Sequence, residues 1–259
     1  MLKKLNLFHN MFFFNNQNES YSSSFSNLFS GLQFGFTTRK TGDCRKISII
    51  QDYFKLNNIS GNKVVLLEQI HSANVYFTNQ QIATNNIEQI EECDGVISLE
   101  KKVNLVVRTA DCLPVVFFST RMNCIGIAHI GWRGTLKMLM SKMISGMKEV
   151  GAKNKDIYII IGPAINQCCY EVDIDTYSEF MSIMERFNKV AFKTHGEKFR
   201  LNLTRLNYEL ALESGIDKTH IDHFPFCTSC NSDYFFSFRR DYKTSPHLFG
   251  EMMGYVTIK

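Results

Sequence analysis

Three residues whose side chains bind metals or act as nucleophiles stand at the ends of apolar segments. His71 lies just past a first apolar run, Cys112 directly precedes a second, 113–119, and His129 directly follows a third, 124–128. A short polar link joins the second and third runs, so we expect them to form neighbouring antiparallel strands. Because the start of one antiparallel strand lies beside the end of the other, Cys112 and His129 should share one edge of a sheet.

These side chains allow two kinds of chemistry. Imidazole and thiolate ligands suit Zn²⁺ and also copper, and three protein ligands leave one position on a tetrahedral zinc ion for substrate. In the second reading, Cys112 is a nucleophile and His129 is its general base. Asp111 is then a candidate for orienting the histidine. The residues alone do not choose between ligand and nucleophile, and a buried cysteine with two ordinary histidines is the simplest alternative.

Several arginines are candidates for binding an anion. Arg39, Arg133, Arg239 and Arg240 each stand beside a glycine or near an expected turn. A guanidinium group matches the geometry of phosphate or carboxylate, although a solvated surface charge is the simpler reading of any one of them. Arg133 is the strongest candidate because it follows His129 by four residues and two glycines flank its turn.

A second group of cysteines has a spacing that occurs in metal and redox sites. Cys227 and Cys230 are separated by two residues, as in a zinc or redox pair. A structural zinc ion needs two more ligands, for which Cys168 and Cys169 are candidates. We expect instead that Cys227 and Cys230 are unrelated thiols in a loop and hold no structural zinc.

Composition limits the class of protein. The chain has 259 residues, of which 44% are hydrophobic, so it can bury a sizeable core. Its net charge of +4 is dispersed and lacks the basic stripe of a nucleic-acid-binding protein. No apolar run reaches the roughly 18 residues of a membrane span. Polar residues interrupt the basic and apolar start, 1–14, so we expect no secretion signal. We therefore expect a cytoplasmic protein. Because disulfides are rare in that compartment, the eight cysteines are expected to be free thiols or metal ligands.

Hydrophobic periodicity predicts strands and helices in mixed order. A short strand and turn are expected within 31–42, and further strands at 63–69, 75–78 (as its extension), 95–98, 103–107, 113–119, 124–128, 157–161, 199–203, 221–226 and 235–238. Helices are expected at 48–56, 134–150, 174–187 and 204–214. The Asn- and Ser-rich stretch 15–27 and the polar stretch 79–92 are expected to be loops or connections. Because strands and helices do not alternate strictly, the sequence favours one α+β domain.

Six motifs resemble those of the multicopper-polyphenol-oxidase-like family, also called the YfiH/YlmD or laccase-domain family. In chain order they are QIHSANV around His71, CDGVIS at 93–98, TADCLPVVF around Cys112, GIAHIGWRGT around His129, GPAINQCCYEV at 162–172 and FSFRRD at 236–241. The resemblance extends from about residue 31 to the C-terminus. It implies a variable N-terminal segment, 1–30, and a single catalytic domain, 31–259. The implied α+β fold packs mixed β-sheets inside flanking helices, similar to the deamidase domain of cytotoxic necrotizing factor.

The resemblance also implies an activity. Members are zinc-dependent purine nucleoside phosphorylases that act on adenosine, inosine and methylthioadenosine and also deaminate adenosine. Their ligands fall on His71, Cys112 and His129, with copper as the alternative metal. Nucleosides and phosphate are the expected partners of a monomer that binds neither nucleic acid nor membrane, and Arg39 and Arg133 are our candidates for holding phosphate.

Three alternatives and three departures accompany this interpretation. The alternatives are a Cys-His amidase that edits peptidoglycan precursors, a copper-dependent polyphenol oxidase and a binding module without catalysis.

The chain has Ser72 where the family often has Gly, and Ile130 where it often has Ala. At 244–247 it has Thr-Ser-Pro-His where the family often shows Thr-Gly-Arg. If that arginine binds an anion in relatives, this chain lacks the contact, and His247 is at best a partial substitute.

Overall fold

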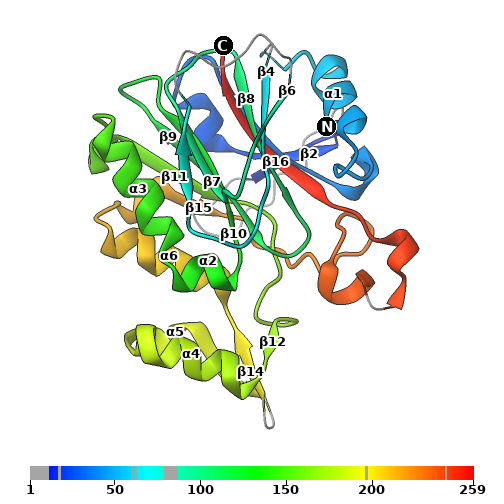
Figure 1. Cartoon of the computed structure of the whole chain (residues 1–259), viewed down its shortest axis with the longest axis vertical. Coiled ribbons are helices and arrows are strands. Elements are labelled where there is room, and N and C mark those ends of the chain that lie inside the picture. Colours follow the sequence, from blue (N-terminus) through cyan, green and yellow to red (C-terminus); the bar gives the residue numbers. More distant parts are fainter. Residues whose placement is uncertain are drawn as a thin grey trace.

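Two β-sheets pack face to face at the centre of the protein, and helices cover their outer faces (Figure 1). The computed structural model describes residues 12–16, 19–59, 61, 63–78, 87–195, 198–242 and 244–259. This mixed α+β single-domain arrangement confirms the predicted fold class. The domain boundary at residue 31 stays a prediction. Of the segment 1–14, on which the expected absence of a secretion signal rests, residues 1–11 lie outside the described residues.

The six-stranded sheet contains the two strands on which the sequence analysis centred. Its order is β15 (Ile221–His223), β11 (Ile157–Ile161), β9 (Leu113–Ser119), β10 (Ile125–Ile130), β7 (Gly95–Ser98) and β5 (Val75–Phe77). β9 and β10 are antiparallel, and His129 lies opposite Pro114. The expectation that Cys112 and His129 share one edge of a sheet is therefore confirmed.

The seven-stranded sheet contains strands that the sequence analysis missed. Its order is β1 (Phe12–Asn15), β2 (Ser20–Ser23), β3 (Leu32–Thr37), β16 (Met252–Ile258), β8 (Val103–Thr109), β4 (Lys63–Leu67) and β6 (Ile87–Ile90). The loop expected at 15–27 is wrong, because β1 and β2 pair there as a hairpin. β16 lies in the middle of the sheet between β3 and β8 and was not predicted. Residues 79–86 of the expected connection 79–92 lie outside the described residues.

Alternating apolar side chains hold the layers together. In β9, Val115 and Phe117 face the helices, whereas Val116 and Phe118 face the seven-stranded sheet. Successive side chains of a strand point to opposite faces, so a strand that is apolar throughout belongs between two layers. β4 and β8 follow the same rule, with one face toward the other sheet and one toward α1.

Helices form the outer layers and a smaller third unit (Figure 1). α3 (Leu139–Glu149) and α6 (Leu203–Glu213) cover the six-stranded sheet, and α1 (Ile47–Leu56) covers the other sheet. α4 (Ile174–Met184) and α5 (Asn188–Ala191) pack on a small sheet of β12 (Glu171–Val172), β14 (Lys198–Leu201) and β13 (Phe192–His195). None of the helices formed by the described residues has the length and apolar character needed to cross a lipid bilayer.

Three predicted elements differ from the structure. The helix expected at 134–150 is two helices, α2 (Trp132–Leu136) and α3, because Met138 adopts a left-handed conformation with φ of 63°. Val75–Phe77 does not extend β4 but joins the other sheet as β5. The strand expected at 235–238 is absent, and a π-helical turn, η6, follows at Phe238–Tyr242. The 3-10 turns are η1 (Ser24–Asn27), η2 (Arg39–Thr41), η3 (Asn154–Asp156), η4 (Glu185–Phe187), η5 (Lys218–His220) and η7 (Pro246–Leu248).

Candidate functional site

His71, Cys112 and His129 converge at one end of the two central sheets. Cys112 precedes β9, His129 lies in β10, and His71 comes from the segment after β4. The Sγ atom of Cys112 lies 3.8 Å from Nε2 of His71, and one ligand atom from each of the three residues lies within 4.8 Å of the others. The three residues that the sequence singled out therefore form one cluster.

The cluster has the donors and the space that a metal ion needs. Zinc bonds of about 2.3 Å to sulfur and 2.0–2.1 Å to nitrogen place the two ligand atoms about 3.6 Å apart around a tetrahedral ion. The observed separation of 3.8 Å between Cys112 and His71 matches that value. Gly131 keeps this space open, since a Cβ atom there would lie 3.0 Å from Cys112 Sγ and 3.0 Å from His71 Cδ2. The residues fit zinc or copper.

Filling this space is expected to displace the metal. We predict that Gly131→Ala weakens zinc binding by on the order of tenfold or more, as other disturbances around ligands do. A chelator-competition titration measures the effect. Gly134→Ala is the matched control, because its nearest contact would be the Ser72 carbonyl oxygen at 3.2 Å rather than a ligand atom. Equal zinc affinity in wild type and Gly131→Ala would contradict the prediction.

The buried carboxylate of Asp94 orients both histidines. It accepts a hydrogen bond of 2.8 Å from Nδ1 of His129, which leaves the other ring nitrogen for a metal. It also accepts bonds from the backbone amides of Ile70, His71 and Ser72, at 3.2, 3.1 and 2.5 Å, and from the Ser72 hydroxyl at 2.7 Å. These bonds hold His71 at a φ of 57°, a conformation that non-glycine residues rarely adopt.

Sequence reasoning missed Asp94. It stands in the motif CDGVIS, where an Asp before a Gly reads as a turn residue. The family resemblance could have pointed to Asp94, because CDGVIS is one of the six motifs that this chain shares with the family. The departure at Ser72 also acquires a role, since its hydroxyl donates to the same carboxylate.

Asp111 does not have the predicted role of orienting His129. Its φ of 92° lies in the left-handed region, and its carboxylate accepts hydrogen bonds from Thr228 Oγ1, Ser237 Oγ and the Arg239 amide, at 2.6, 2.9 and 2.7 Å. Burial raises its pKa despite these bonds. Asp111 thus ties the start of β9 to the C-terminal loops, and Asp94 contacts the histidine instead.

The electrostatics of the cluster favour a thiolate at Cys112. Burial raises the pKa of this thiol, but the charge and hydrogen bond of His129 and those of His71 outweigh it and lower the pKa to about 7. Burial lowers the pKa of His129, yet Cys112 and Asp94 raise it to about 10. The thiolate is the form that binds metals and attacks carbonyl carbon, so both readings of Cys112 remain chemically sound.

A cavity of about 580 Å³ opens over the cluster. Its lining is mixed, with charged, polar and aromatic groups from many segments, and consists of Glu68, Gln69, His71, Arg108, Thr109, Ala110, Asp111, Cys112, His129, Trp132, Arg133, Ile165, Tyr170, Leu203, Phe238, Arg239, Phe249 and Glu251. Most of these residues, Arg108 and Tyr170 among them, were not singled out from the sequence. They belong to strand ends and loops that only the fold brings together.

The candidate arginines divide into two groups. Arg133 lines the cavity, with its guanidinium 4.2 Å from the centre of the Trp132 ring, and Arg239 also lines it. Arg39 lies outside the cavity lining, where it donates to the Ser232 carbonyl at 2.6 Å and stacks on the Phe236 ring. Of the two arginines expected to hold phosphate, only Arg133 therefore lines the cavity.

Two further predicted positions lie outside the lining. Arg240 also lies outside it and binds Asp241 and three backbone carbonyls. His247, the suggested substitute for the missing arginine, is exposed and does not line the cavity.

Comparisons with known proteins identify relatives of this chain by sequence. The chain is 31% identical over 171 residues to the purine nucleoside phosphorylase YlmD of Bacillus subtilis, covering 66% of this chain and 60% of that protein. It is 39% identical over 136 residues to a purine nucleoside phosphorylase of Rickettsia prowazekii, covering 52% of each. It is 25% identical over 182 residues to the adenosine deaminase RL5 of an unknown prokaryotic organism, covering 68% of this chain and 70% of that protein. The alignment thus spans little more than half the length of the first two relatives.

Solved structures have the same fold. The crystal structure of the hypothetical protein YfiH of Bacillus licheniformis superposes with a TM-score of 0.83 at 25% identity, covering 94% of this chain and 98% of that one. YlmD of Geobacillus stearothermophilus superposes with a TM-score of 0.80 at 25% identity, covering 93% and 96%. The family model described as multi-copper polyphenol oxidoreductase laccase matches residues 22–259. With its six motifs, its fold and this match over most of its length, the chain belongs to the multi-copper polyphenol oxidoreductase laccase family, which is the YfiH/YlmD family.

Proposed function

We propose that this protein is a zinc-dependent purine nucleoside enzyme. It phosphorolyses adenosine, inosine and methylthioadenosine to the free base and a ribose 1-phosphate or methylthioribose 1-phosphate, and it deaminates adenosine. The observation that carries the proposal is the convergence of His71, Cys112 and His129 on one open position beneath the cavity. The names of relatives as phosphorylases and as an adenosine deaminase support it. We also propose that it acts as a cytoplasmic monomer.

The cavity suits a nucleoside. Its volume lies in the range of roughly 300–1,000 Å³ that is usual for small-molecule sites. Trp132, Tyr170 and Phe238 offer aromatic surface against which a purine can pack. Cys112 and His129 line the same cavity as these rings, so a base packed on the rings would place its reactive atoms near the metal ligands. Copper remains the alternative metal.

The protein's own residues divide the work. A zinc ion held by two His and a Cys supplies a Lewis acid and an activated water near neutral pH. Asp94 keeps His129 in one tautomer and the His71 backbone in place. Deamination requires water at C6 of adenine, whereas phosphorolysis requires phosphate near C1′ of the sugar. The group that lies beside the nucleoside in the cavity, water or phosphate, therefore determines which reaction occurs.

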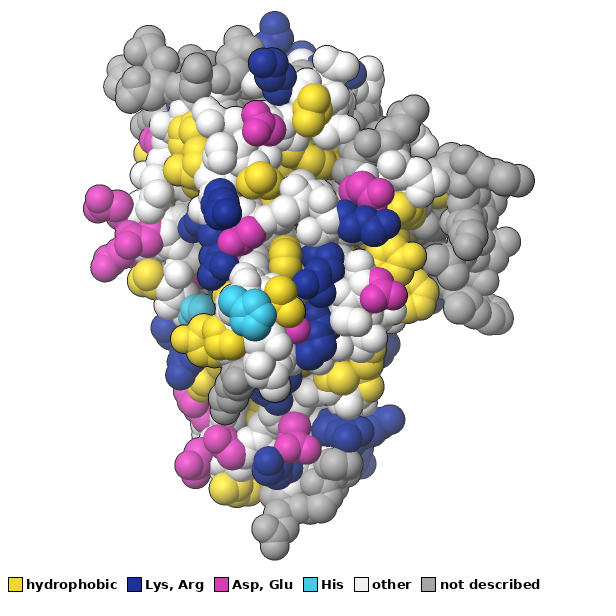
Figure 2. Space-filling model, turned by 90° about the vertical axis from the view of Figure 1, so that its right-hand side faces the viewer, with side chains coloured by type: hydrophobic (Ala, Val, Ile, Leu, Met, Phe, Trp, Pro, Cys, Tyr) yellow, Lys and Arg dark blue, Asp and Glu magenta, His cyan; other side chains and the backbone are white. Residues whose placement is uncertain are grey.

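Phosphate needs cationic partners in the cavity. A phosphate dianion binds best to guanidinium groups that form paired hydrogen bonds. Arg133 has no ion-pair partner among the described residues, and Arg108 and Arg239 line the same cavity. Figure 2 shows a face of the molecule on which Lys and Arg side chains gather beside histidine side chains. We propose Arg133 as the main phosphate ligand, because Arg39 lies outside the cavity lining.

Replacing Arg133 by lysine should separate the two reactions. We predict that Arg133→Lys raises the KM for phosphate about tenfold or more, because an ammonium group cannot form the paired hydrogen bonds of a guanidinium. Adenosine deamination, which uses water, should largely survive. Steady-state kinetics with and without phosphate measure both. Arg121→Lys is the control, since Arg121 pairs with Asp156 outside this cavity. Equal loss of both activities with loss of zinc would show that Arg133 is structural.

A product assay tests the proposed function. Zinc-loaded protein is incubated with adenosine, with and without phosphate, and the products are separated by chromatography. Without phosphate we expect inosine as the only product, and with phosphate we expect adenine, hypoxanthine from phosphorolysis of that inosine, and ribose 1-phosphate. Chelation should remove both activities and added zinc should restore them. Absence of any purine product from zinc-loaded, folded protein would overturn the proposal.

One observation favours a second candidate function. Cys112 Sγ lies 3.8 Å from His71 Nε2, the arrangement of a thiol nucleophile and its base, so His71 would take the place of the expected base His129 in a Cys-His amidase acting on peptidoglycan precursors. This candidate requires catalysis without metal, and a Cys112 variant distinguishes it from the first. We do not propose phenol oxidation, because a single ion with three protein ligands offers no evident place for the multi-electron reduction of oxygen.

A further inference from the structure

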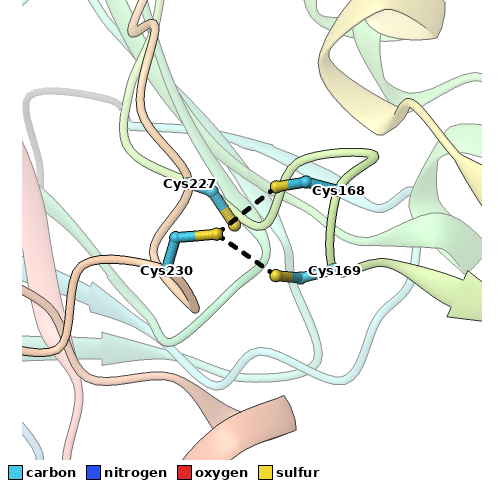
Figure 3. Close-up of side chains that lie close together, drawn as sticks. All are labelled: Cys168, Cys169, Cys227 and Cys230. Carbon is cyan, nitrogen blue, oxygen red and sulfur yellow. Dashed lines mark hydrogen bonds between the residues drawn. The ribbon is translucent and has the colours of Figure 1, made fainter.

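Four cysteines from two distant loops meet beside the pocket (Figure 3). Cys168 and Cys169 follow β11, and Cys227 and Cys230 follow β15. We propose that these four residues form a second metal site, a structural zinc site with four thiolate ligands. This proposal does not rest on the nucleoside activity. It also corrects the expectation that Cys227 and Cys230 are unrelated thiols, since all four sulfur atoms lie within 4.8 Å of one another.

The sulfur positions match a tetrahedral ion. Zinc–sulfur bonds of about 2.3 Å place the sulfur atoms of a tetrathiolate site about 3.8 Å apart. The Sγ atom of Cys230 lies 3.5 Å from that of Cys168 and 3.3 Å from that of Cys169. In Figure 3 the four side chains point toward a common centre. One ion at that centre would contact all four with small adjustments.

The donor set selects zinc among the occupants of cysteine sites. Four soft thiolates suit Zn²⁺ and leave no open position, which is the pattern of a structural rather than a catalytic zinc. An iron–sulfur cluster places irons and sulfides between its ligands, and sulfur atoms this close together leave no room for one. All four cysteines are free, and the 3.5 and 3.3 Å separations of Cys230 from Cys168 and Cys169 are much longer than the roughly 2.05 Å of a disulfide bond.

The surrounding backbone prepares the site. The amide of Asn166 donates a hydrogen bond of 3.3 Å to the Cys227 sulfur, a contact that stabilises a thiolate. Ala164 and Cys227 form a β-bridge, and the Thr228 amide donates to the Ala164 carbonyl at 3.0 Å. These contacts fix the two loops against each other independently of any metal, so little ordering remains for the ion to impose.

Arg240 braces the second cysteine loop. The Nη1 atom of Arg240 donates to the carbonyls of Thr228 and Ser229, at 3.0 and 2.9 Å, between the two cysteines of the second loop. The same guanidinium pairs with Asp241 through Nε and Nη2, so it holds this loop in place and does not serve as a free counter-charge.

The site braces one wall of the pocket. Ile165 and Tyr170, which line the cavity, flank the first cysteine pair. Thr228, between the second pair, donates to Asp111, which precedes Cys112. Loss of the second zinc should therefore loosen the loops around the pocket and lower the thermal midpoint, while the His71-Cys112-His129 ligands themselves stay in place.

Metal counting on single variants tests the inference. Untagged protein is loaded with zinc, freed of excess metal and analysed by mass spectrometry for zinc per chain. We expect two zinc ions in wild type, one in Cys230→Ser and one in Cys112→Ser. Cys93→Ser is the control and should retain two, because Cys93 is a partly exposed cysteine in neither cluster. Cys230 is exposed, so its replacement should leave the fold intact.

A second measurement needs no substitution. Apo wild-type protein is titrated with Co²⁺, and tetrathiolate coordination should give visible bands at longer wavelength and far more intense thiolate charge-transfer absorption than the single thiolate of the His-Cys-His site. One zinc ion in wild type that persists in Cys230→Ser, together with absence of the tetrathiolate spectrum, would overturn the inference. A mass lower by two hydrogens with two fewer titratable thiols would show a disulfide instead and would also overturn it. A wild type with one zinc that Cys230→Ser loses would uphold this site and refute the His-Cys-His site.

Discussion

Cys112→Ser is expected to lower zinc affinity and nucleoside turnover together. The thiolate is the soft ligand of the cluster, and a hydroxyl group replaces it poorly. Loss of a direct ligand should exceed the roughly 10–100-fold effect of losing an outer hydrogen-bond partner. Zinc affinity is measured by competition with a chromophoric chelator, and turnover by the adenosine assay.

The same variant decides between ligand and nucleophile. If Cys112→Ser keeps full zinc but loses all activity, Cys112 acts as a nucleophile and the amidase reading gains. Cys93→Ser is the matched control and should change neither quantity. A result in which zinc and activity fall in parallel, and return in parallel at high zinc concentration, supports the metal reading.

Asp94→Asn is expected to have the second largest effect. The carboxylate accepts hydrogen bonds from His129, from three successive amides and from the Ser72 hydroxyl. Asparagine has the same shape, but an NH₂ group replaces one carboxylate oxygen. Its N–H donors would therefore face the N–H and O–H donors of these partners, with no acceptor between them. Zinc affinity and activity should fall roughly 10–100-fold. The free energy of unfolding should fall by about 1–3 kcal/mol because buried groups lose their partners.

Asp111→Asn is the control that isolates the orienting role. Asp111 is also buried and also accepts three hydrogen bonds, but none of them comes from a histidine. This variant should lose a similar amount of stability and keep most of its zinc affinity. Similar losses of zinc affinity in both variants would show that the effect of Asp94 comes from general destabilisation.

The sequence predicted the centre of the site but not its supports. Cys112 and His129 were placed correctly because two apolar runs joined by a short link pair in only one way. Asp94 was missed because its partners lie 22 to 35 residues away and nothing local distinguishes it from a turn residue. Asp111 was misassigned because nearness along the chain was taken for nearness in space, whereas its positive φ turns the carboxylate away.

The elements of the fold were also predicted only in part. Buried strands such as β9 and β11 are apolar throughout and were found, since their composition alone marks them. β16 was missed, although it pairs with both β3 and β8, because no local turn joins it to either neighbour. The hairpin of β1 and β2 was missed because the stretch that contains β2 is rich in Asn and Ser, whereas aromatic side chains such as Phe12 and Tyr21 anchor the hairpin in the core. The cysteine pairs converge only through tertiary structure.

The most direct test of the central claim is a crystal structure of zinc-loaded protein with anomalous scattering measured at the zinc edge. We expect an anomalous peak between His71, Cys112 and His129, with bonds of about 2.0–2.1 Å to nitrogen and about 2.3 Å to sulfur. The bond to His129 should use Nε2, because Asp94 occupies Nδ1. A fully zinc-loaded crystal without a peak at this position, or with any of the three side chains turned into a separate part of the core, would contradict the account.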